Sequence, residues 1–198
     1  MEKKKEKQNL EQKARLIGVG STGHGVGCTH FSVLLLNYLA GCRRRKPVLL
    51  EWNTSGDFEK LERVCTGRNR EGKRFRILDA DYYKAAGPVE LTAVLDGNYD
   101  DILIDFGVLD EVSMAEFLRC EKQFVIGSVT EWQEEAFRDF VNRYGTGKKS
   151  WTCLAAFGSE EARKEFARRL NLSVSGIPSS EDAFSVTKVC CRFFDSLI

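Results

Sequence analysis

The sequence has few of the residues that would mark a specialised class of protein. Among its 198 residues are three prolines and two histidines, and 30 Lys or Arg nearly balance 29 Asp or Glu. The scarcity of proline and a hydrophobic content of 42% exclude a low-complexity chain. The balanced charge provides no overall attraction to nucleic acid or to an anionic membrane. The length suits one large α/β domain with a substantial core.

Long hydrophobic runs are also lacking. No window contains the ~18 apolar residues of a membrane span, and the charged N-terminus does not resemble a secretory signal. We therefore expect no integral membrane segment and a cytoplasmic location. Zinc-type spacing is missing too, because the seven cysteines include no C-x-x-C pair. They are interpreted as reduced, mostly buried thiols.

The first 13 residues consist almost entirely of Glu, Lys and Gln. This composition predicts a charged, flexible tail over residues 1–13, followed by a domain over residues 14–198. A basic tail can contact nucleic acid or a membrane surface. Here Glu2, Glu6 and Glu11 dilute the positive charge, so neither partner is indicated.

From Arg15 onward, short apolar runs alternate with helical patterns. Continuous apolar strands separated by helices predict an α/β fold, a single doubly wound, mainly parallel sheet of about seven strands flanked by helices. The expected strands are Arg15–Val19, Pro47–Trp52, Arg74–Leu78, Asp101–Phe106, Gln123–Ser128, Trp151–Phe157 and Ser173–Ile177. The expected helices are Cys28–Ala40, Asp57–Cys65, Pro88–Leu95, Val112–Cys120, Glu131–Tyr144, Glu160–Leu170 and Glu181–Leu197.

The most informative stretch is rich in glycine and lies between the first expected strand and the first expected helix. Five glycines fall within the ten residues from Gly18 to Gly27. A loop of this kind at a helix N-terminus can direct several backbone N–H groups at one anion, with the helix dipole behind them. The stretch therefore predicts a phosphate-binding loop.

Two phosphate-binding motifs fit this loop. Residues Gly18 to Gly23 match the dinucleotide pattern G-x-G-x-x-G, which would indicate an NAD(P)-binding oxidoreductase. That motif requires a helix that opens near Gly20, where three further glycines would each cost roughly 1 kcal/mol. A P-loop, G-x-x-x-x-G-K-[ST], fits better because a helix that begins at Cys28 matches the apolar block after it. Cys28, however, stands where the P-loop lysine would be.

Polar residues end two further expected strands. Glu51 and Asn53 follow one apolar run, and Asp105 follows another in the form of a Walker B segment. In P-loop proteins such an aspartate holds Mg²⁺ together with a hydroxyl of the loop, here Thr29. Because ligands bind outside the carboxyl ends of the strands in open α/β sheets, we expect these residues at one edge.

With these segments, the chain from Arg15 onward resembles the ParA/MinD group of P-loop ATPases, the deviant Walker A (SIMIBI) class, with TadZ/CpaE-like members closest in character. The family loop reads K-G-G-V-G-K-T-[TS]. The corresponding residues are Gly23, His24, Gly25, Val26, Gly27, Cys28, Thr29 and His30. The resemblance implies that these residues bind nucleotide and that Thr29 and Asp105 bind the metal. It also aligns Glu51-Trp52-Asn53 with the family's D-x-D pattern.

The departures from the family pattern concern the chemistry. Both lysines are replaced, by Gly23 and Cys28, and the carboxylate that helps set up the attacking water is the amide Asn53. A cation about 4 Å from a phosphate oxygen is worth on the order of 4 kcal/mol at an effective dielectric constant near 20. We therefore expect weak binding of ATP or ADP with Mg²⁺ and little hydrolysis. The run Arg43–Arg45 is expected at the opposite edge of the sheet and does not replace the lysines.

The resulting prediction is a pseudo-ATPase that acts as a positioning or regulatory adaptor, through a homodimer or another protein partner. One alternative is an active ATPase of partition or localisation type, completed by a partner's cation. A second alternative is the NAD(P)-binding oxidoreductase. Purely structural roles are also open for several residues, with Cys28 packed beneath the loop, Asp105 capping a turn and Trp52 in the core.

Overall fold

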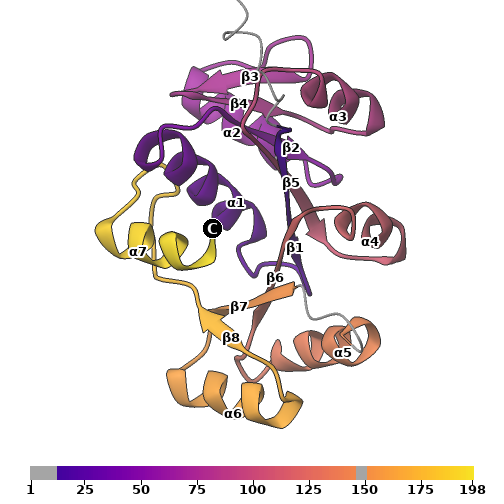
Figure 1. Ribbon diagram of the computed structural model, residues 1–198, viewed down its shortest axis with the longest axis vertical. Helices are drawn as coiled ribbons and strands as arrows, with labels where there is room; N and C mark the ends of the chain where they lie inside the picture. The colour runs from indigo at the N-terminus through magenta and orange to yellow at the C-terminus, as the bar shows by residue number, and fades with distance from the viewer. Residues whose placement is uncertain (1–12, 146–150) are drawn as a thin grey trace, which may run out of the picture.

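The computed structural model describes residues 13–145 and 151–198, so the tail expected at residues 1–13 lies almost wholly outside the described residues. Figure 1 shows one twisted sheet with helices on both sides. The strands are β1 (Arg15–Ser21), β2 (Pro47–Glu51), β3 (Arg74–Ile77), β4 (Ala80–Tyr83), β5 (Asp101–Val108), β6 (Lys122–Ser128), β7 (Trp151–Phe157) and β8 (Val174–Gly176). The helices are α1 (Cys28–Asn37), extended by a π-helical turn (Tyr38–Cys42), α2 (Asp57–Thr66), α3 (Pro88–Leu95), α4 (Glu111–Phe117), α5 (Glu134–Tyr144), α6 (Glu160–Leu170) and α7 (Lys188–Leu197).

The strand order is β3-β4-β2-β5-β1-β6-β7-β8, and every pairing is parallel except that of β3 with β4. The expected doubly wound, mainly parallel sheet is therefore confirmed. Strand β1 lies near the middle, between β5 and β6, so the loop that follows it is flanked by strands on both sides.

The strand count differs from the expectation of about seven, because the sheet has eight strands. The additional strand is β4, which pairs with β2 and places the expected strand β3 at the antiparallel edge. Ile77 pairs with Ala80, so Leu78 and Asp79 alone form the turn, with Leu78 at φ 51°. A leucine in the left-handed region gives no sequence signal for a turn, because Gly, Asn and Asp normally occupy such positions.

The last helix is shorter than expected. Helix α7 begins at Lys188 rather than Glu181, because the Thr187 hydroxyl accepts a hydrogen bond from the Cys190 N–H and caps the helix there. The preceding residues instead pack their apolar side chains, Ala183, Phe184 and Val186, against the core in a non-helical conformation.

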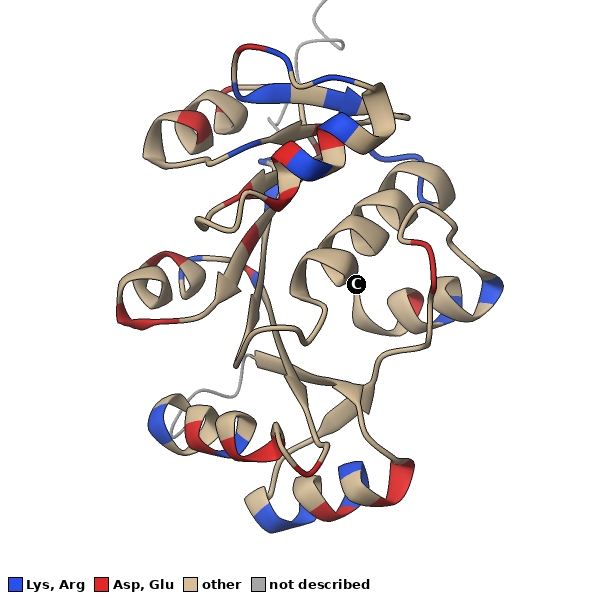
Figure 2. Ribbon diagram, turned by 180° about the vertical axis from the view of Figure 1, so that it is seen from behind, with Lys and Arg blue, Asp and Glu red and all other residues tan. Residues whose placement is uncertain are grey.

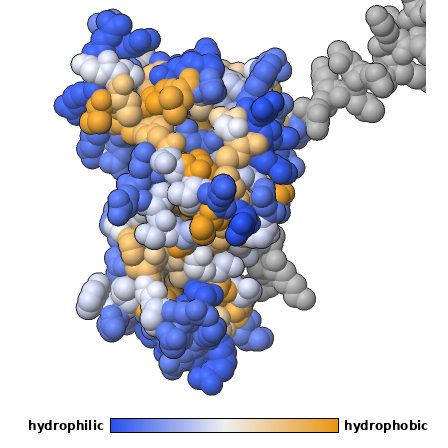
Figure 3. All heavy atoms as spheres, turned by 90° about the vertical axis from the view of Figure 1, so that its left-hand side faces the viewer, coloured by the Kyte–Doolittle hydropathy of each residue, from blue (hydrophilic) through white to orange (hydrophobic). Residues whose placement is uncertain are grey.

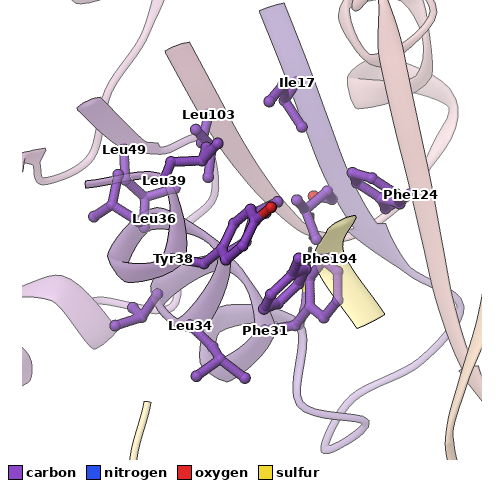
Figure 4. Close-up of a cluster of buried hydrophobic side chains, with 14 of the residues drawn as sticks. Ile17, Phe31, Leu34, Leu36, Tyr38, Leu39, Leu49, Leu103, Phe124 and Phe194 are labelled. Carbon is purple, nitrogen blue, oxygen red and sulfur yellow. Dashed lines mark hydrogen bonds between the residues drawn. The ribbon is translucent and has the colours of Figure 1, made fainter. Parts of the chain in front are cut away.

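Two hydrophobic clusters lie on opposite faces of the sheet. One contains residues of α1, α2 and α7, and Figure 4 shows Phe31, Tyr38 and Phe194 at its centre. The other contains residues of α3, α4, α5 and α6. Strand β2 contributes to both, since Leu49 points to the first cluster and Leu50 to the second. Among the helices described, none combines the length and the apolar character that a membrane span requires.

The register brings together the ends of three strands. Asp105 of β5 pairs with Val19 of β1 on one side and with Glu51 of β2 on the other. These residues lie at the carboxyl edge of the sheet, as expected from the sequence. At the amino edge, buried Asp101 forms ion pairs with Arg15 and Arg45. The arginine run therefore lies away from the glycine loop.

Candidate functional site

The glycine loop connects the central strand directly to the most buried helix. After β1 ends at Ser21, the chain forms a loop through Gly27, and α1 begins at Cys28. Gly25 and Gly27 have φ of 74° and 81°, a left-handed conformation that other residues rarely adopt. Helix onset at Cys28 is the geometry that the P-loop motif requires, and the helix near Gly20 that the dinucleotide motif requires is not present in this described segment.

The earlier glycines of the stretch serve packing. A Cβ atom on Gly20 would lie 2.4 Å from Leu109 Cγ, and one on Gly18 would lie 2.9 Å from Cys120 Sγ. Gly23 is different, because a Cβ there meets nothing nearer than Ala136 Cβ at 4.0 Å. The sequence motifs assign Gly18 and Gly20 a role only in the less favoured dinucleotide pattern, and the structure places both in close contact between elements.

A cavity of about 1000 Å³ lies over the loop at the carboxyl edge of the sheet. It is lined by residues 23–30 of the glycine loop and first turn of α1, by residues 52–55 and Asp57 after β2, by residues 85–86, by residues 106–108 at the end of β5, and by Asp110, Val112 and Ser113 after it. The cavity contains every sequence-predicted binding residue from Gly23 to His30, and also Asn53. No Lys or Arg lines it among the described residues, whereas Asp57 and Asp110 do. Figure 2 shows the loop and α1 without a charged residue.

Cys28 lies beneath the loop and is buried. Its Sγ is 3.2 Å from Asp105 Oδ1, 3.7 Å from the Gly107 carbonyl oxygen and 3.8 Å from the Val19 carbonyl oxygen. Burial first, and then the charge of Asp105, raises the pKa of this thiol well above its ordinary value. Cys28 therefore remains a protonated thiol at neutral pH, which agrees with packing rather than with nucleophilic chemistry.

Asp105 is also buried, at the end of β5. Its Oδ1 accepts hydrogen bonds from the Gly107 N–H at 2.9 Å and from the Cys28 thiol, whereas Oδ2 has no hydrogen-bond partner among the described residues. Burial raises the pKa of this carboxyl group, and interactions with the Thr29 hydroxyl and Gly107 N–H oppose the rise. Asp105 therefore caps the turn at Gly107, and its buried Oδ2 lies beneath the cavity wall, because Asp105 is not among the residues that line the cavity.

Two oxygen-bearing side chains near the loop are of the kind that binds a divalent cation. The Thr29 hydroxyl favours the charged form of Asp105 and so lowers the pKa of that carboxyl group, which places the two groups near each other at the start of α1. Oxygen ligands of this kind suit Mg²⁺, which usually keeps several waters and binds substrate phosphates as well. No group of three or more His, Cys, Asp or Glu side chains within residues 13–145 and 151–198 is arranged to hold a metal.

Asn53 has a structural task that the sequence did not reveal. Its Nδ2 donates to the backbone carbonyl of Asp105 at 3.0 Å, and its Oδ1 accepts from the Ser55 N–H at 2.9 Å. An aspartate at this position could not donate the first of these bonds. Asn53 thus joins the segment after β2 to the end of β5, and it lines the cavity while doing so.

Glu51 and Ser21 fix the surrounding backbone. The buried Glu51 carboxylate accepts hydrogen bonds from the Phe58 N–H at 3.1 Å, the Ala85 N–H at 3.1 Å and the Ser55 hydroxyl. Ser21 Oγ donates to the Gly107 carbonyl at 2.9 Å. Sequence reasoning placed Glu51 at this edge but missed its role as an anchor for two loops, and Ser21 carried no recognisable signal.

The remaining candidates are more peripheral. His24 and His30 both line the cavity but are exposed. Trp52 is partly buried, and its ring centroid lies 6.2 Å from that of Phe106. Trp52 packs against the second hydrophobic cluster and also lines the cavity, so it belongs both to the core and to the cavity wall.

No family model matches the sequence, and no curated protein matches it either. Solved structures do share its fold. A ParA family ATPase from Chlorobium tepidum is 14% identical with a TM-score of 0.62, over 86% of this chain and 87% of that chain. A putative plasmid partition protein from Borrelia burgdorferi, bound to AMPPNP, is 15% identical with a TM-score of 0.64, over 93% and 96%.

The MinC:MinD cell division complex from Aquifex aeolicus also matches, at 15% identity and a TM-score of 0.62, over 85% of this chain and 83% of that chain. The chain therefore has the fold of ParA/MinD-type P-loop ATPases, as the resemblance of its loop and Walker B segment implied. At these identities the likeness concerns the fold, and the chemistry depends on the residues in the cavity.

Proposed function

We propose that this chain is a degenerate P-loop protein that binds nucleotide weakly, hydrolyses little or none, and acts as a positioning or regulatory adaptor. The observation that carries the proposal is the lining of the cavity, which contains no Lys or Arg among the described residues. A triphosphate carries several negative charges, and P-loop proteins neutralise them with a lysine and a metal ion.

The position of Cys28 supports the same proposal. Its thiol points beneath the loop toward Asp105, at 3.2 Å, and its raised pKa keeps it uncharged. One cation about 4 Å from a phosphate oxygen is worth on the order of 4 kcal/mol at an effective dielectric constant of 20. Without it, the backbone N–H groups of the loop and the dipole of α1 are the remaining sources of positive potential.

Thr29 and Asp105 would hold a metal if a nucleotide binds. A bound Mg²⁺ supplies charge neutralisation for phosphate oxygens. In this chain the Thr29 hydroxyl and the Asp105 carboxyl group provide protein oxygens, and the loop orients the phosphates by its backbone. Asn53, with both polar atoms of its amide in hydrogen bonds, does not provide a carboxylate for an attacking water.

The structural neighbours support the adaptor part of the proposal. The Borrelia protein was solved with AMPPNP, and the Aquifex structure contains MinD together with MinC. The same fold in this chain offers a scaffold on which a partner protein or a second copy can dock. We propose that such association, in the cytoplasm, is what the retained loop serves.

Two measurements on the purified full chain test the proposal. Titration calorimetry with ATP and Mg²⁺ should give weak or undetectable binding, and phosphate release should not exceed the buffer blank. ATP turnover typical of a working enzyme would overturn the proposal. Turnover that appears only with an added protein component would instead favour an ATPase completed by a partner's cation.

A gain-of-function variant makes the test specific. Cys28→Lys restores the P-loop lysine, and Gly23→Lys restores the second one at a position where a side chain has space. If absent cations limit binding, the double variant should bind ATP at least 10-fold more tightly, the equivalent of about 1.4 kcal/mol. Cys28→Met, with a long uncharged side chain, is the matched control and should gain nothing. Equal binding by the two variants would contradict the charge argument.

A further inference from the structure

Two cysteines from distant parts of the chain face each other on the side of the molecule away from the cavity. Cys42 Sγ and Cys191 Sγ lie 3.1 Å apart, although the residues are separated by 149 positions in the sequence. Cys42 ends the π-helical turn that follows α1, and Cys191 lies in the first turn of α7. Cys42 is exposed and Cys191 is half-buried, so reagents in solution can reach the pair.

Other contacts hold these two segments in place independently of the sulfur atoms. The Tyr38 hydroxyl donates a hydrogen bond to Asp195, and Arg43 forms an ion pair with the same carboxylate at 3.4 Å. The ring of Phe194 lies 5.0 Å from that of Tyr38, as Figure 4 shows. The approach of the two thiols is therefore a consequence of the packing of α7 on α1.

The other five cysteines do not share this arrangement. Four are buried, and the exposed one, Cys65, is a free cysteine without a hydrogen bond to another sulfur among the described residues. Cys190, adjacent to Cys191, points into the core, where its Sγ lies 3.2 Å from the Thr187 hydroxyl. Figure 3 views the side of the molecule on which α7 lies, where hydrophobic patches are set among hydrophilic residues.

We propose that Cys42 and Cys191 form a site of oxidative modification, at which thiol–disulfide exchange with a small-molecule disulfide such as oxidised glutathione produces an intramolecular disulfide. The exposed Cys42 thiolate attacks one glutathione sulfur and releases one reduced glutathione. The Cys191 thiolate then attacks the Cys42 sulfur of the mixed disulfide and releases the second. Two electrons pass to glutathione, and each released thiolate takes up one of the two protons that the cysteines lose.

The surroundings of Cys42 determine how fast the first exchange step runs. Burial, the Cys191 thiol and the negative charge of Asp195 raise the pKa of Cys42 to about 11. The same rise lowers the fraction of Cys42 thiolate at neutral pH, so the first exchange step is slow there and becomes faster as the pH is raised. The closed form links the end of α1 to α7 covalently. Because α1 begins at the glycine loop, the disulfide restrains the helix whose first turn lines the cavity.

The test uses the full chain, equilibrated without oxygen in glutathione buffers of increasing oxidised fraction, quenched with acid and analysed by intact mass and peptide mapping. We expect a two-hydrogen mass loss and a cross-linked peptide pair containing Cys42 and Cys191. The melting temperature should rise by about 5–15 °C, because a disulfide that closes a long loop constrains the unfolded chain. Mixed disulfides at Cys42 or Cys191 without the cross-link would overturn the proposal.

Serine variants provide the controls. Cys191→Ser should trap glutathione on Cys42 and lose both the cross-link and the gain in melting temperature. Cys65→Ser, at an exposed cysteine elsewhere, should retain both. If Cys65→Ser also lost the cross-link, or if an oxidised wild-type chain melted at the temperature of the reduced one, the assigned pair or its structural effect would be wrong.

Discussion

Asp105 is a carboxyl group that the fold buries without a cation beside it in the described part of the chain. One oxygen accepts two hydrogen bonds and the other accepts none. Burial consequently raises the pKa of Asp105, so the folded state holds a proton on this group more tightly than the unfolded chain does. In an unliganded protein of this kind the carboxylate reduces stability at neutral pH.

We predict that Asp105→Asn stabilises the protein at neutral pH. The amide oxygen can keep the bonds from Gly107 and Cys28, and the buried charge disappears. The stability that protonated Asp105 contributes to the wild type is fully present below the ordinary aspartate pKa of about 3.9. It is lost as the pH rises through the higher pKa of the folded state. The gain should therefore be present near pH 7 and vanish toward pH 4, because the charge that burial disfavours exists only above the raised pKa of Asp105. Urea unfolding across this range measures it.

Asp110 provides the contrasting control. This exposed residue caps α4, and the Ser113 N–H lowers the pKa of its carboxyl group. Asp110→Asn should therefore destabilise slightly at neutral pH, and that loss should fade as the pH falls through the depressed pKa. A loss of stability in Asp105→Asn at neutral pH would mean that a cation or other group compensates the Asp105 charge.

Asn53 both lines the cavity and joins the segment after β2 to the end of β5 by hydrogen bonds. We predict that Asn53→Asp lowers stability by roughly 1–3 kcal/mol, because the Asp105 carbonyl loses one of its two donors, keeping only the Trp52 N–H, and a new charge enters beside buried carboxylates. Thermal unfolding compared with Thr54→Asp, which adds the same charge at an exposed neighbour, measures the effect. Equal melting temperatures for the two variants would remove the structural role assigned to this amide.

At the scale of elements, the strands and helices that could be predicted are those that a local apolar pattern marks in the sequence. The central strands β1, β2 and β5 and helix α1 each contain a short apolar run, and their ends are found within a few residues of the expectation. Roles that depend on distant partners could not be predicted. The ion pairs of Asp101 with Arg15 and Arg45 are one example, since 86 and 56 positions of the sequence separate the partners.

The β3–β4 hairpin escaped prediction because its turn has unusual chemistry. Leu78 has φ 51° and is exposed, a conformation that costs a non-glycine residue roughly 1–2 kcal/mol. We predict that Leu78→Asn raises the melting temperature by a few degrees, because Asn tolerates this conformation and an exposed apolar side chain is removed. Differential scanning fluorimetry is sufficient to measure the shift.

A matched control separates relief of strain from a general gain in polarity. Val64 is also exposed, on α2, and its backbone is helical. Val64→Asn should therefore give no gain, and a small loss of helix propensity is expected. Equal gains in both variants would show that the turn conformation contributes nothing to the effect at Leu78.

At the scale of the whole molecule, the two faces of the sheet are covered by helices from different parts of the chain. The face that carries α1 is closed by α7, from the C-terminal part of the chain, and the two helices meet through aromatic rings. Phe194 is fully buried, with ring centroids 5.6 Å from Phe31 and 5.0 Å from Tyr38. Since α1 is held between the sheet and α7, the position of the glycine loop depends on this contact.

We therefore predict that Phe194→Ala destabilises the protein by roughly 3–5 kcal/mol, the usual cost of removing a buried phenylalanine side chain. Limited proteolysis should at the same time cleave the segment before α7 faster than in the wild type, because the helix loses its anchor on α1. Phe193→Ala, at the less buried neighbouring ring, is the matched control and should cost much less. If the two variants unfold at the same urea concentration, α7 is not the element that holds α1, and the glycine loop must be positioned from the sheet side alone.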